Sequence, residues 1–167
     1  MNCPNCGALM NLGENGESFQ CEYCRSVYVP EPNVEGVRVL GEAANELCPV
    51  CSVPLVQATL AGHRLLHCKQ CEGMLVPMDD FVALLAELRA RSTGARGVQP
   101  SADRSQLNRR LHCPRCHQPM DTHFYEGPGN IIIDDCSPCR VNWLDSGELM
   151  RVVQAPDHVY SEDTYGR

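Results

Sequence analysis

The sequence lacks the two features that would direct a chain into or across a membrane. No apolar run approaches the roughly 18 residues that a spanning helix needs. No basic, apolar and small-residue segments follow Met1 in the order of a secretory signal. Aromatic residues are also scarce, at 5% of the chain. We therefore expect an intracellular protein of the cytoplasm, where thiols stay reduced and no membrane partner is needed.

No cysteine stands alone in this chain. The 12 cysteines form Cys-x-x-Cys pairs, and two intervening residues let both thiolates leave one tight turn in the same direction. Each pair therefore offers half of a tetrahedral metal site. A reducing compartment and the poor geometry of Cys-x-x-Cys for a structural disulfide favour metal over disulfides. The predicted ligands are Cys3, Cys6, Cys21, Cys24, Cys48, Cys51, Cys68, Cys71, Cys113, Cys116, Cys136 and Cys139.

The gaps between the pairs indicate that neighbouring pairs share one metal. The inner cysteines of each expected site are separated by roughly 14 to 19 residues, which is close to zinc-ribbon spacing. A crossed arrangement would span the long segment from Cys71 to Cys113 and is disfavoured. We expect three Zn²⁺ per chain, each held by four cysteines. Iron in a rubredoxin-like site is the alternative, and His67 or His112 could replace a neighbouring cysteine as ligand.

Turn residues between the pairs predict β-hairpins, and apolar residues at helical spacing predict a helix after each of the last two units. Units this small depend on metal because an apolar core alone is insufficient. The expected fold is a small metal-stabilised, mainly β protein with short helices, built from three tandem zinc ribbons with rubredoxin-like knuckles. The expected domains are zinc ribbon 1 at 1–30, a linker at 31–46, zinc ribbon 2 with its helix at 47–91, a flexible basic linker at 92–111, zinc ribbon 3 with its helix at 112–154, and a tail at 155–167.

The second and third units are repeats of each other, with Leu75-Val76 aligned to Trp143-Leu144. In the third unit, Cys113-Pro114-x-Cys116 and Cys136-x-x-Cys139 precede Trp143-Leu144-Asp145-Ser146-Gly147-Glu148-Leu149. This pattern resembles the small zinc-ribbon family named after transcription factor IIB, over residues 112–153 and more loosely over 47–90. The resemblance implies a zinc-ribbon fold and a link to transcription, but no reaction. We interpret Asp145 and Glu148 as a helix-capping pair rather than as catalytic carboxylates.

Charge separates the candidate functions. The formal net charge of −7 opposes a general attraction to nucleic-acid phosphates, and thiolates that outnumber the zinc charges make it more negative. The acidic third unit is suited to a basic protein partner. The candidate docking residues are Glu126, Asp134 and Asp135. Arginines gather instead in the connector before this unit, so direct DNA or RNA binding is the alternative function. Its candidate contacts are Arg96, Arg104, Arg109 and Arg110.

Enzymatic activity is not expected. Thiol oxidoreductases need a free Cys-x-x-Cys thiolate, whereas each pair here has a mate at ribbon spacing. Catalytic zinc keeps an open coordination position, which four thiolates close. We therefore expect a non-enzymatic scaffold that docks on a protein partner, with transcription machinery as the first candidate. A redox or metal-handling protein is the second alternative.

Overall fold

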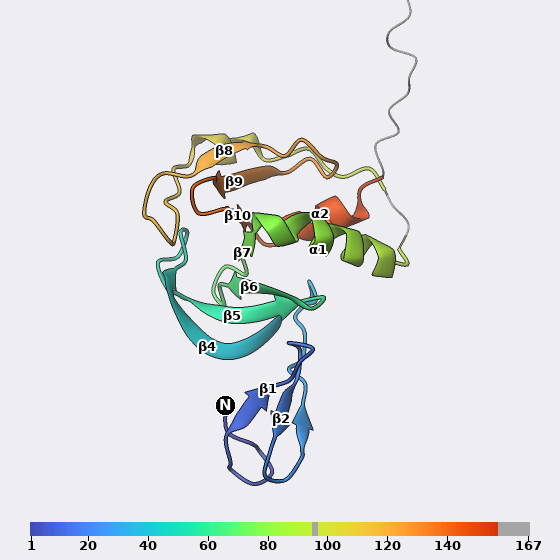
Figure 1. Cartoon of the computed structure of the whole chain (residues 1–167). Coiled ribbons are helices and arrows are strands. Elements are labelled where there is room, and N and C mark those ends of the chain that lie inside the picture. Colours follow the sequence, from blue (N-terminus) through green and yellow to red (C-terminus); the bar gives the residue numbers. More distant parts are fainter. Residues whose placement is uncertain (95–96, 157–167) are drawn as a thin grey trace, which may run out of the picture.

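The strands of the described chain form two separate sheets. The computed structural model describes residues 1–94 and 97–156. A three-stranded sheet has the order β1-β2-β3, and a seven-stranded sheet has the order β4-β5-β6-β7-β10-β9-β8. Figure 1 shows the small sheet projecting from one end of the molecule, and both helices lying together beside the large sheet. Within the described residues, no helix is long and apolar enough to span a membrane.

The small sheet is zinc ribbon 1. Its strands are β1 (Met10–Leu12), β2 (Phe19–Cys21) and β3 (Val27–Tyr28). The Asn15 side-chain oxygen accepts hydrogen bonds from the amides of Glu17 and Ser18, which builds the turn between β1 and β2. Met10 and Phe19 are buried in a small apolar cluster beside the first cysteine pairs. A core this small explains why the ribbon needs a metal.

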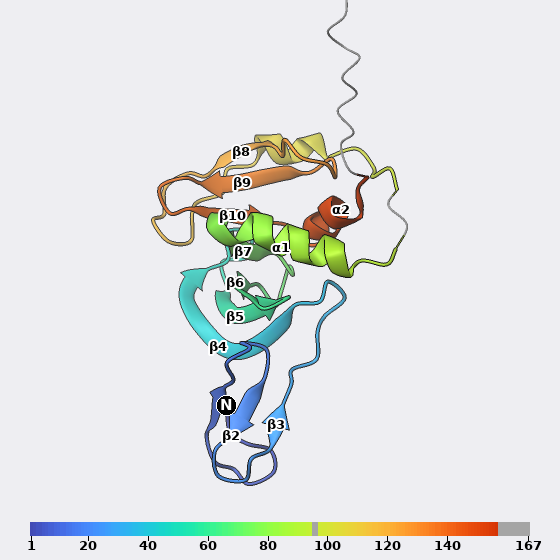
Figure 2. The same ribbon diagram turned by 45° about the vertical axis from the view of Figure 1, so that its right-hand side comes forward.

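Strand β4 (Arg38–Leu47) occupies a segment that the sequence predicted to be linker. It pairs antiparallel with β5 (Pro54–Leu60), and the register shifts between Val39 and Ala43, where Gly41 has a φ of +89°. Figure 2 shows β4 curving around β5. The prediction of a linker at 31–46 is therefore wrong from Arg38 onward. The pairing satisfies backbone groups along β5 that would otherwise form an open sheet edge.

The second and third ribbons each contribute three consecutive antiparallel strands to the large sheet. These are β5, β6 (His63–His67) and β7 (Met74–Pro77) in ribbon 2, and β8 (Asp121–Phe124), β9 (Ile132–Cys136) and β10 (Val141–Leu144) in ribbon 3. The two ribbons join where β7 pairs antiparallel with β10, and Leu75 lies opposite Trp143. These two residues are equivalent positions of the repeat. The ribbons are therefore related by a local twofold axis, as in a symmetric dimer within one chain.

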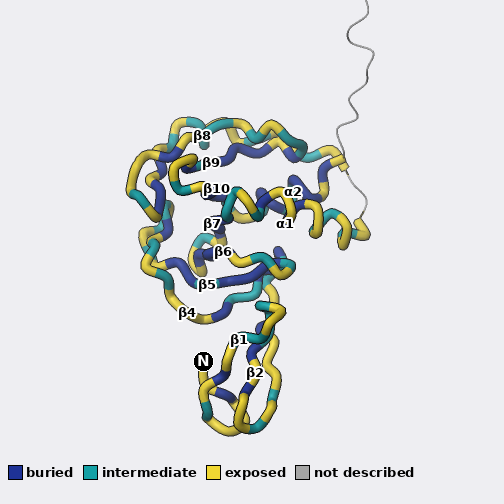
Figure 3. Tube along the Cα trace, viewed as in Figure 1, coloured by how far each residue is buried: buried dark blue, intermediate teal, exposed yellow. Residues whose placement is uncertain are grey.

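Both expected helices are present. They are α1 (Met78–Arg91) and α2 (Glu148–Gln154), and their buried residues are Phe81, Leu84, Leu85, Glu148, Leu149, Val152 and Val153. The apolar side chains among them join one core with Val76 of β7 and Ile133 of β9. A second core contains Trp143 and Leu75 together with the cysteines of ribbons 2 and 3. Figure 3 shows buried residues along most strands of the large sheet and mainly exposed residues in ribbon 1.

The connector between ribbons 2 and 3 is more structured than its composition suggests. It contains a 3-10 helix, η1 (Arg104–Asn108). The side chain of Asp103 caps its start by accepting a hydrogen bond from the Ser105 amide. Further along, Arg109 forms ion pairs with Asp134 and Asp145 of ribbon 3. The prediction of a flexible linker at 92–111 is therefore wrong for this part of the segment. Arg96 lies outside the described residues, as does the predicted tail beyond Pro156.

Candidate metal centres

All six Cys-x-x-Cys pairs adopt a similar tight turn. A residue with left-handed φ follows the second cysteine of each pair: Gly7 (78°), Arg25 (60°), Ser52 (59°), Glu72 (58°), His117 (60°) and Arg140 (52°). At Gly7 the backbone amide donates a hydrogen bond of 2.8 Å to the carbonyl oxygen of Cys3, and Ser52 repeats this contact with Cys48 at 2.9 Å. The turn places both thiols of a pair on one side. It leaves further amides near the sulfur atoms, and the Cys51 amide donates to Cys48 Sγ at 3.3 Å.

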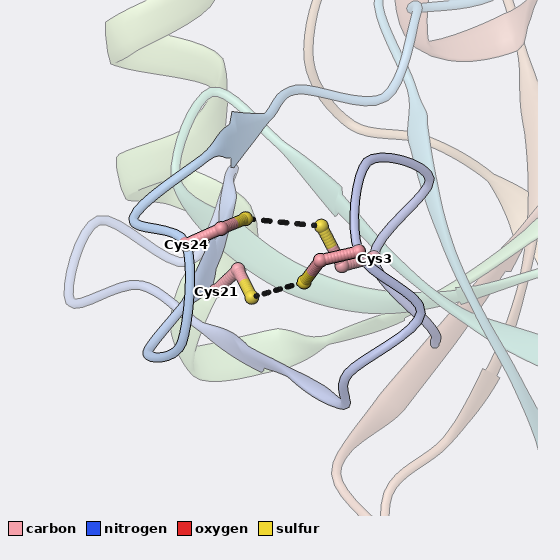
Figure 4. A group of neighbouring side chains, drawn as sticks. Cys3, Cys21 and Cys24 are labelled. Atoms are coloured by element: carbon pink, nitrogen blue, oxygen red, sulfur yellow. Dashed lines mark hydrogen bonds between the residues drawn. The ribbon is translucent and has the colours of Figure 1, made fainter.

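The thiols of neighbouring pairs converge into three groups of four, as the sequence predicted. Within each group all four sulfur atoms lie within 4.8 Å of one another. The closest contacts join one pair to the other: 3.5 Å from Cys6 to Cys21, and 3.6 Å from Cys48 to Cys71 and from Cys116 to Cys136. In ribbon 1, Figure 4 shows the thiols of Cys3, Cys21 and Cys24 turned towards a shared centre. Tetrahedral zinc with bonds of about 2.3 Å needs sulfur separations of about 3.8 Å, so the groups fit this ion.

The comparison with known families agrees with this geometry. Residues 47–87 and 112–155 match the transcription factor zinc-finger family, whose members contain a zinc ribbon of the transcription factor IIB type. The chain belongs to this family. No curated protein and no solved structure matches it. The family match covers ribbons 2 and 3, whereas ribbon 1 is identified by its own cysteine group.

The three four-cysteine groups suit three zinc ions, in keeping with the family. The first cysteine of each pair is buried, and the second is more accessible. Four thiolates complete a tetrahedral shell, so the zinc ions hold the fold and leave no coordination position for a substrate. Neither His67 nor His112 belongs to a metal group within the described residues. His67 is buried, and desolvation lowers its pKa, so its ring is held neutral.

The three predicted docking acids of ribbon 3 have different environments. Glu126 is exposed. Asp134 is fully buried, at 0% exposure, and is bound by Arg109 and by the Thr122 hydroxyl. Asp135 is half-buried and contacts the His123 ring at 2.9 Å. The prediction that Asp134 belongs to a docking surface is therefore wrong, because its carboxylate is bound inside the ribbon. Side chains along a strand point alternately inward and outward, and Asp134 is on the inward register.

The arginines proposed for nucleic acid are also divided. Arg104 is exposed and its guanidinium lies 5.6 Å from the centre of the Phe124 ring. Arg110 is exposed. Arg109 is not available to a ligand, because Asp134 and Asp145 bind its guanidinium and these contacts raise its pKa against the effect of burial. Sequence reasoning missed this buried ion-pair network, since its members are far apart along the chain.

The prediction that Asp145 and Glu148 form a helix-capping pair is wrong in its geometry, because the N-cap of α2 is Gly147 and no side chain caps the helix. The Glu148 carboxylate instead accepts a hydrogen bond of 2.8 Å from the Asp145 amide, in the turn before the helix. The Asp145 carboxylate accepts from Trp143 Nε1 at 3.0 Å instead of capping a helix amide. Glu148 is buried, and desolvation raises its pKa to about 7. Both carboxylates are thus used in holding the Trp143 segment and α2 together.

Proposed function

We propose that the protein is a non-enzymatic interaction scaffold in which zinc ribbon 1 docks on a protein partner. The observation that carries the proposal is the exposure of large apolar side chains on this ribbon. Tyr23 is 84% exposed, and other large exposed side chains gather on the same small module. They are Leu9, Val27, Tyr28 and Val29. Apolar and aromatic side chains gathered on a small projecting module are typical of a protein-binding surface.

The edge of the small sheet supports the same proposal. Strand β3 pairs with β2 on one side, and no strand of the described chain pairs with its other side. Both of its residues, Val27 and Tyr28, are exposed. An extended segment of a partner could add to this edge through backbone hydrogen bonds, with the apolar side chains giving specificity.

Charge indicates the kind of partner. Within residues 1–31 the acids outnumber the bases, with Arg25 as the single basic side chain. The acids are Glu14, Glu17, Glu22 and Glu31. An acidic surface with apolar anchors is suited to a basic, extended protein segment and repels nucleic-acid phosphates. Membership of a transcription factor family makes components of the transcription machinery the first candidates, in a reducing cytoplasm where the thiols can hold zinc.

Direct nucleic-acid binding is the second candidate, and its support is the exposed pair Arg104 and Arg110. The buried ion pairs of Arg109 reduce the basic surface that the connector offers. We therefore rank this function below protein docking.

Capture from nuclease-treated lysate of the native cell, with the zinc-loaded chain as bait, tests the proposal. The captured protein is identified by mass spectrometry and its direct binding to the purified chain is then measured. We expect the double variant Val27→Lys/Val29→Lys to weaken this direct binding by at least about tenfold, because positive charge is placed at the apolar centre of a contact with a basic partner. Val82→Lys is the matched control, since Val82 is 74% exposed on α1, outside ribbon 1.

All variants should keep three thiolate-bound zinc ions per chain, which shows that the ribbons remain folded. Equal partner binding by the double variant and by the control would refute docking through ribbon 1. A complex that disappears with nuclease, weakens steeply with salt and depends on Arg104 and Arg110 would support the nucleic-acid alternative instead.

A further inference from the structure

A row of polar side chains crosses three neighbouring strands of ribbon 3. Asp121 of β8 lies opposite Asp135 of β9, and Asp135 lies opposite Asn142 of β10. Residues directly opposite each other on antiparallel strands point to the same face of a sheet. His123 follows Asp121 by two residues and therefore shares this face. Four side chains with metal-binding or hydrogen-bonding atoms are thus placed on one face, away from the cysteine group to which Cys136 belongs.

The donor atoms are close enough to bind one ion. One ligand atom each from Asp121, His123 and Asp135 lie within 4.8 Å of one another. His123 Nε2 lies 2.9 Å from Asp135 Oδ1, and the Ser137 hydroxyl donates to the other oxygen of Asp135 at 3.0 Å. Two ligands of one metal ion with bonds of about 2.0–2.2 Å are separated by roughly 3 to 3.5 Å. Small side-chain rotations therefore suffice to bring the three groups around a metal.

The hydrogen bonding of the His123 ring favours a cation between the ring and Asp135. Nδ1 lies 2.9 Å from the carbonyl oxygen of Phe124, so an N–H on this nitrogen donates to the backbone. In the neutral ring, Nε2 then carries a lone pair directed at a carboxylate oxygen. These two acceptors repel each other unless a cation, either a proton or a metal ion, lies beside them. Histidines that bind metals usually donate their second ring nitrogen to a carbonyl or carboxylate in this way.

Charge distinguishes a metal ion from a proton. Like charges directly opposite each other in a sheet are destabilising, and Asp121 faces Asp135. A proton on His123 balances one carboxylate, whereas a divalent ion balances both. No lysine or arginine forms an ion pair with either carboxylate within residues 1–94 and 97–156.

Asn142 supplies a further unpaired polar group beside these residues. The residue is 6% exposed, and its carboxamide forms no hydrogen bond with another described residue. Its amide atoms are not among the fully buried unpartnered side-chain atoms, so they remain open to the neighbouring cavity and are available to a ligand there. Asn142 lines the same cavity as His123 and Asp135, with a volume of about 360 Å³. An ion in this cavity would give the carboxamide oxygen a partner, and water would have room to complete the coordination.

We propose that Asp121, His123 and Asp135 bind a divalent transition-metal ion, with the Asn142 carboxamide oxygen as a further donor. One imidazole nitrogen with several oxygen atoms suits borderline ions such as Zn²⁺ better than it suits thiophilic ions. This site differs from the four-cysteine groups because its ligands are partly exposed and its shell is completed by water. Its ion is therefore exchangeable, whereas the ribbon zinc ions are part of the fold.

The test is a calorimetric titration of the full chain, already loaded with three zinc ions, with Zn²⁺. We expect one additional ion per chain and a shift of the His123 Nε2 resonance in ¹⁵N NMR spectra. His123→Gln should weaken this binding by about tenfold or more, since a ligand is lost. His63→Gln is the matched control, because His63 also lies near a carboxylate, 3.8 Å from Asp80, without further acidic donors in a metal group.

Two further variants keep the result interpretable. Asp121→Asn removes a charge from an exposed side chain and should also weaken the fourth ion about tenfold, with no change in the three ribbon zincs. Asn142→Leu should weaken it by a few-fold and leave the His123 resonance shift in place at saturation. Saturation at three ions overturns the proposal. Equal affinity of the fourth ion for the wild type, His123→Gln and Asp121→Asn would also overturn the proposal.

Discussion

Ribbon 1 and the paired ribbons 2 and 3 use the same cysteine turn but are stabilised differently. Ribbon 1 has a three-stranded sheet, a small apolar cluster and an outer strand whose two residues are exposed. Ribbons 2 and 3 join through β7 and β10, and both faces of their shared sheet are covered by apolar cores. Each ribbon thus has the same kind of four-cysteine zinc site. The strand that follows its second Cys-x-x-Cys pair decides whether the ribbon forms a separate sheet or joins its sheet to that of another ribbon.

The segment after the second knuckle differs in a way that explains the pairing. In ribbon 2 it is Gly73 followed by the buried strand β7, and in ribbon 3 it is the buried strand β10. Strand β3 of ribbon 1 occupies the equivalent place and remains exposed. A strand that is apolar on both faces must be covered on both faces. Pairing of β7 with β10 under α1 and α2 satisfies this need, and it leaves ribbon 1 as the module with free surface.

The variant with the largest expected effect removes zinc from ribbon 3, and it tests whether ribbons 2 and 3 depend on each other. Cys136→Ser/Cys139→Ser eliminates a metal whose binding is worth about 10 to 16 kcal/mol of folding free energy. We expect ribbons 2 and 3 to lose their native amide resonances together, because β10 forms the neighbour of β7 and shares both cores with it. Ribbon 1 should keep its pattern in ¹H–¹⁵N NMR spectra. Retention of native resonances in residues 47–91 would contradict the pairing.

The reciprocal variant is Cys21→Ser/Cys24→Ser, which removes zinc from ribbon 1. Ribbon 1 should unfold, and the resonances of residues 47–155 should remain near their native positions. The reason is that the core of ribbon 1 contains only Leu40 from β4 and nothing from the paired ribbons. Zinc content measured on the same sample should fall from three ions to two. Collapse of the whole spectrum would mean that ribbon 1 supports the larger sheet.

The sequence predicted the cysteine groups because metal ligands from one tight turn have a fixed local spacing, as at Cys113 and Cys116. It also predicted both helices from their apolar periodicity. It could not predict that β7 pairs with β10, since partners such as Leu75 and Trp143 are joined only by tertiary packing. Strand β4 was missed because Gly41 interrupts its alternation at a bulge. The role of Arg109 was missed because composition alone makes a basic connector resemble solvated chain.

Arg109→Met should be the most damaging substitution that leaves all zinc ligands intact. It removes the partner of Asp134, whose carboxylate then stays buried without compensating charge. Loss of one member of a buried ion pair costs about 3 to 5 kcal/mol. Urea unfolding of the zinc-loaded protein measures this change. Arg110→Met is the control, because Arg110 is exposed. Equal changes in unfolding free energy for the two variants would show that the ion pair of Arg109 with Asp134 does not stabilise the fold.

Gly73→Ala tests the close approach between the paired ribbons. A Cβ at Gly73 would lie 2.4 Å from Cζ2 of Trp143, so the indole ring must shift. Overpacking of this kind typically costs about 1 to 3 kcal/mol. The fluorescence of Trp143, the single tryptophan, reports the shift directly. Gly97→Ala is the control, since a Cβ there would meet no atom within 4 Å. An unchanged emission spectrum with unchanged stability would show that the ribbons can separate at this point.

Glu148→Gln should have the smallest effect, and that effect should appear in the pH dependence of stability. Burial raises the pKa of Glu148 to about 7, above its value in the unfolded chain. The folded protein therefore binds this proton more tightly, and its stability falls as pH rises towards and through 7. From pH 6 to pH 8 this loss amounts to about 1 kcal/mol. Glutamine keeps an oxygen that can accept from the Asp145 amide but does not ionise, so the variant should lack this part of the slope. Urea unfolding of both proteins at equal zinc concentration measures the two slopes. Parallel slopes would place the Glu148 carboxylate in water rather than in the core shared by ribbons 2 and 3.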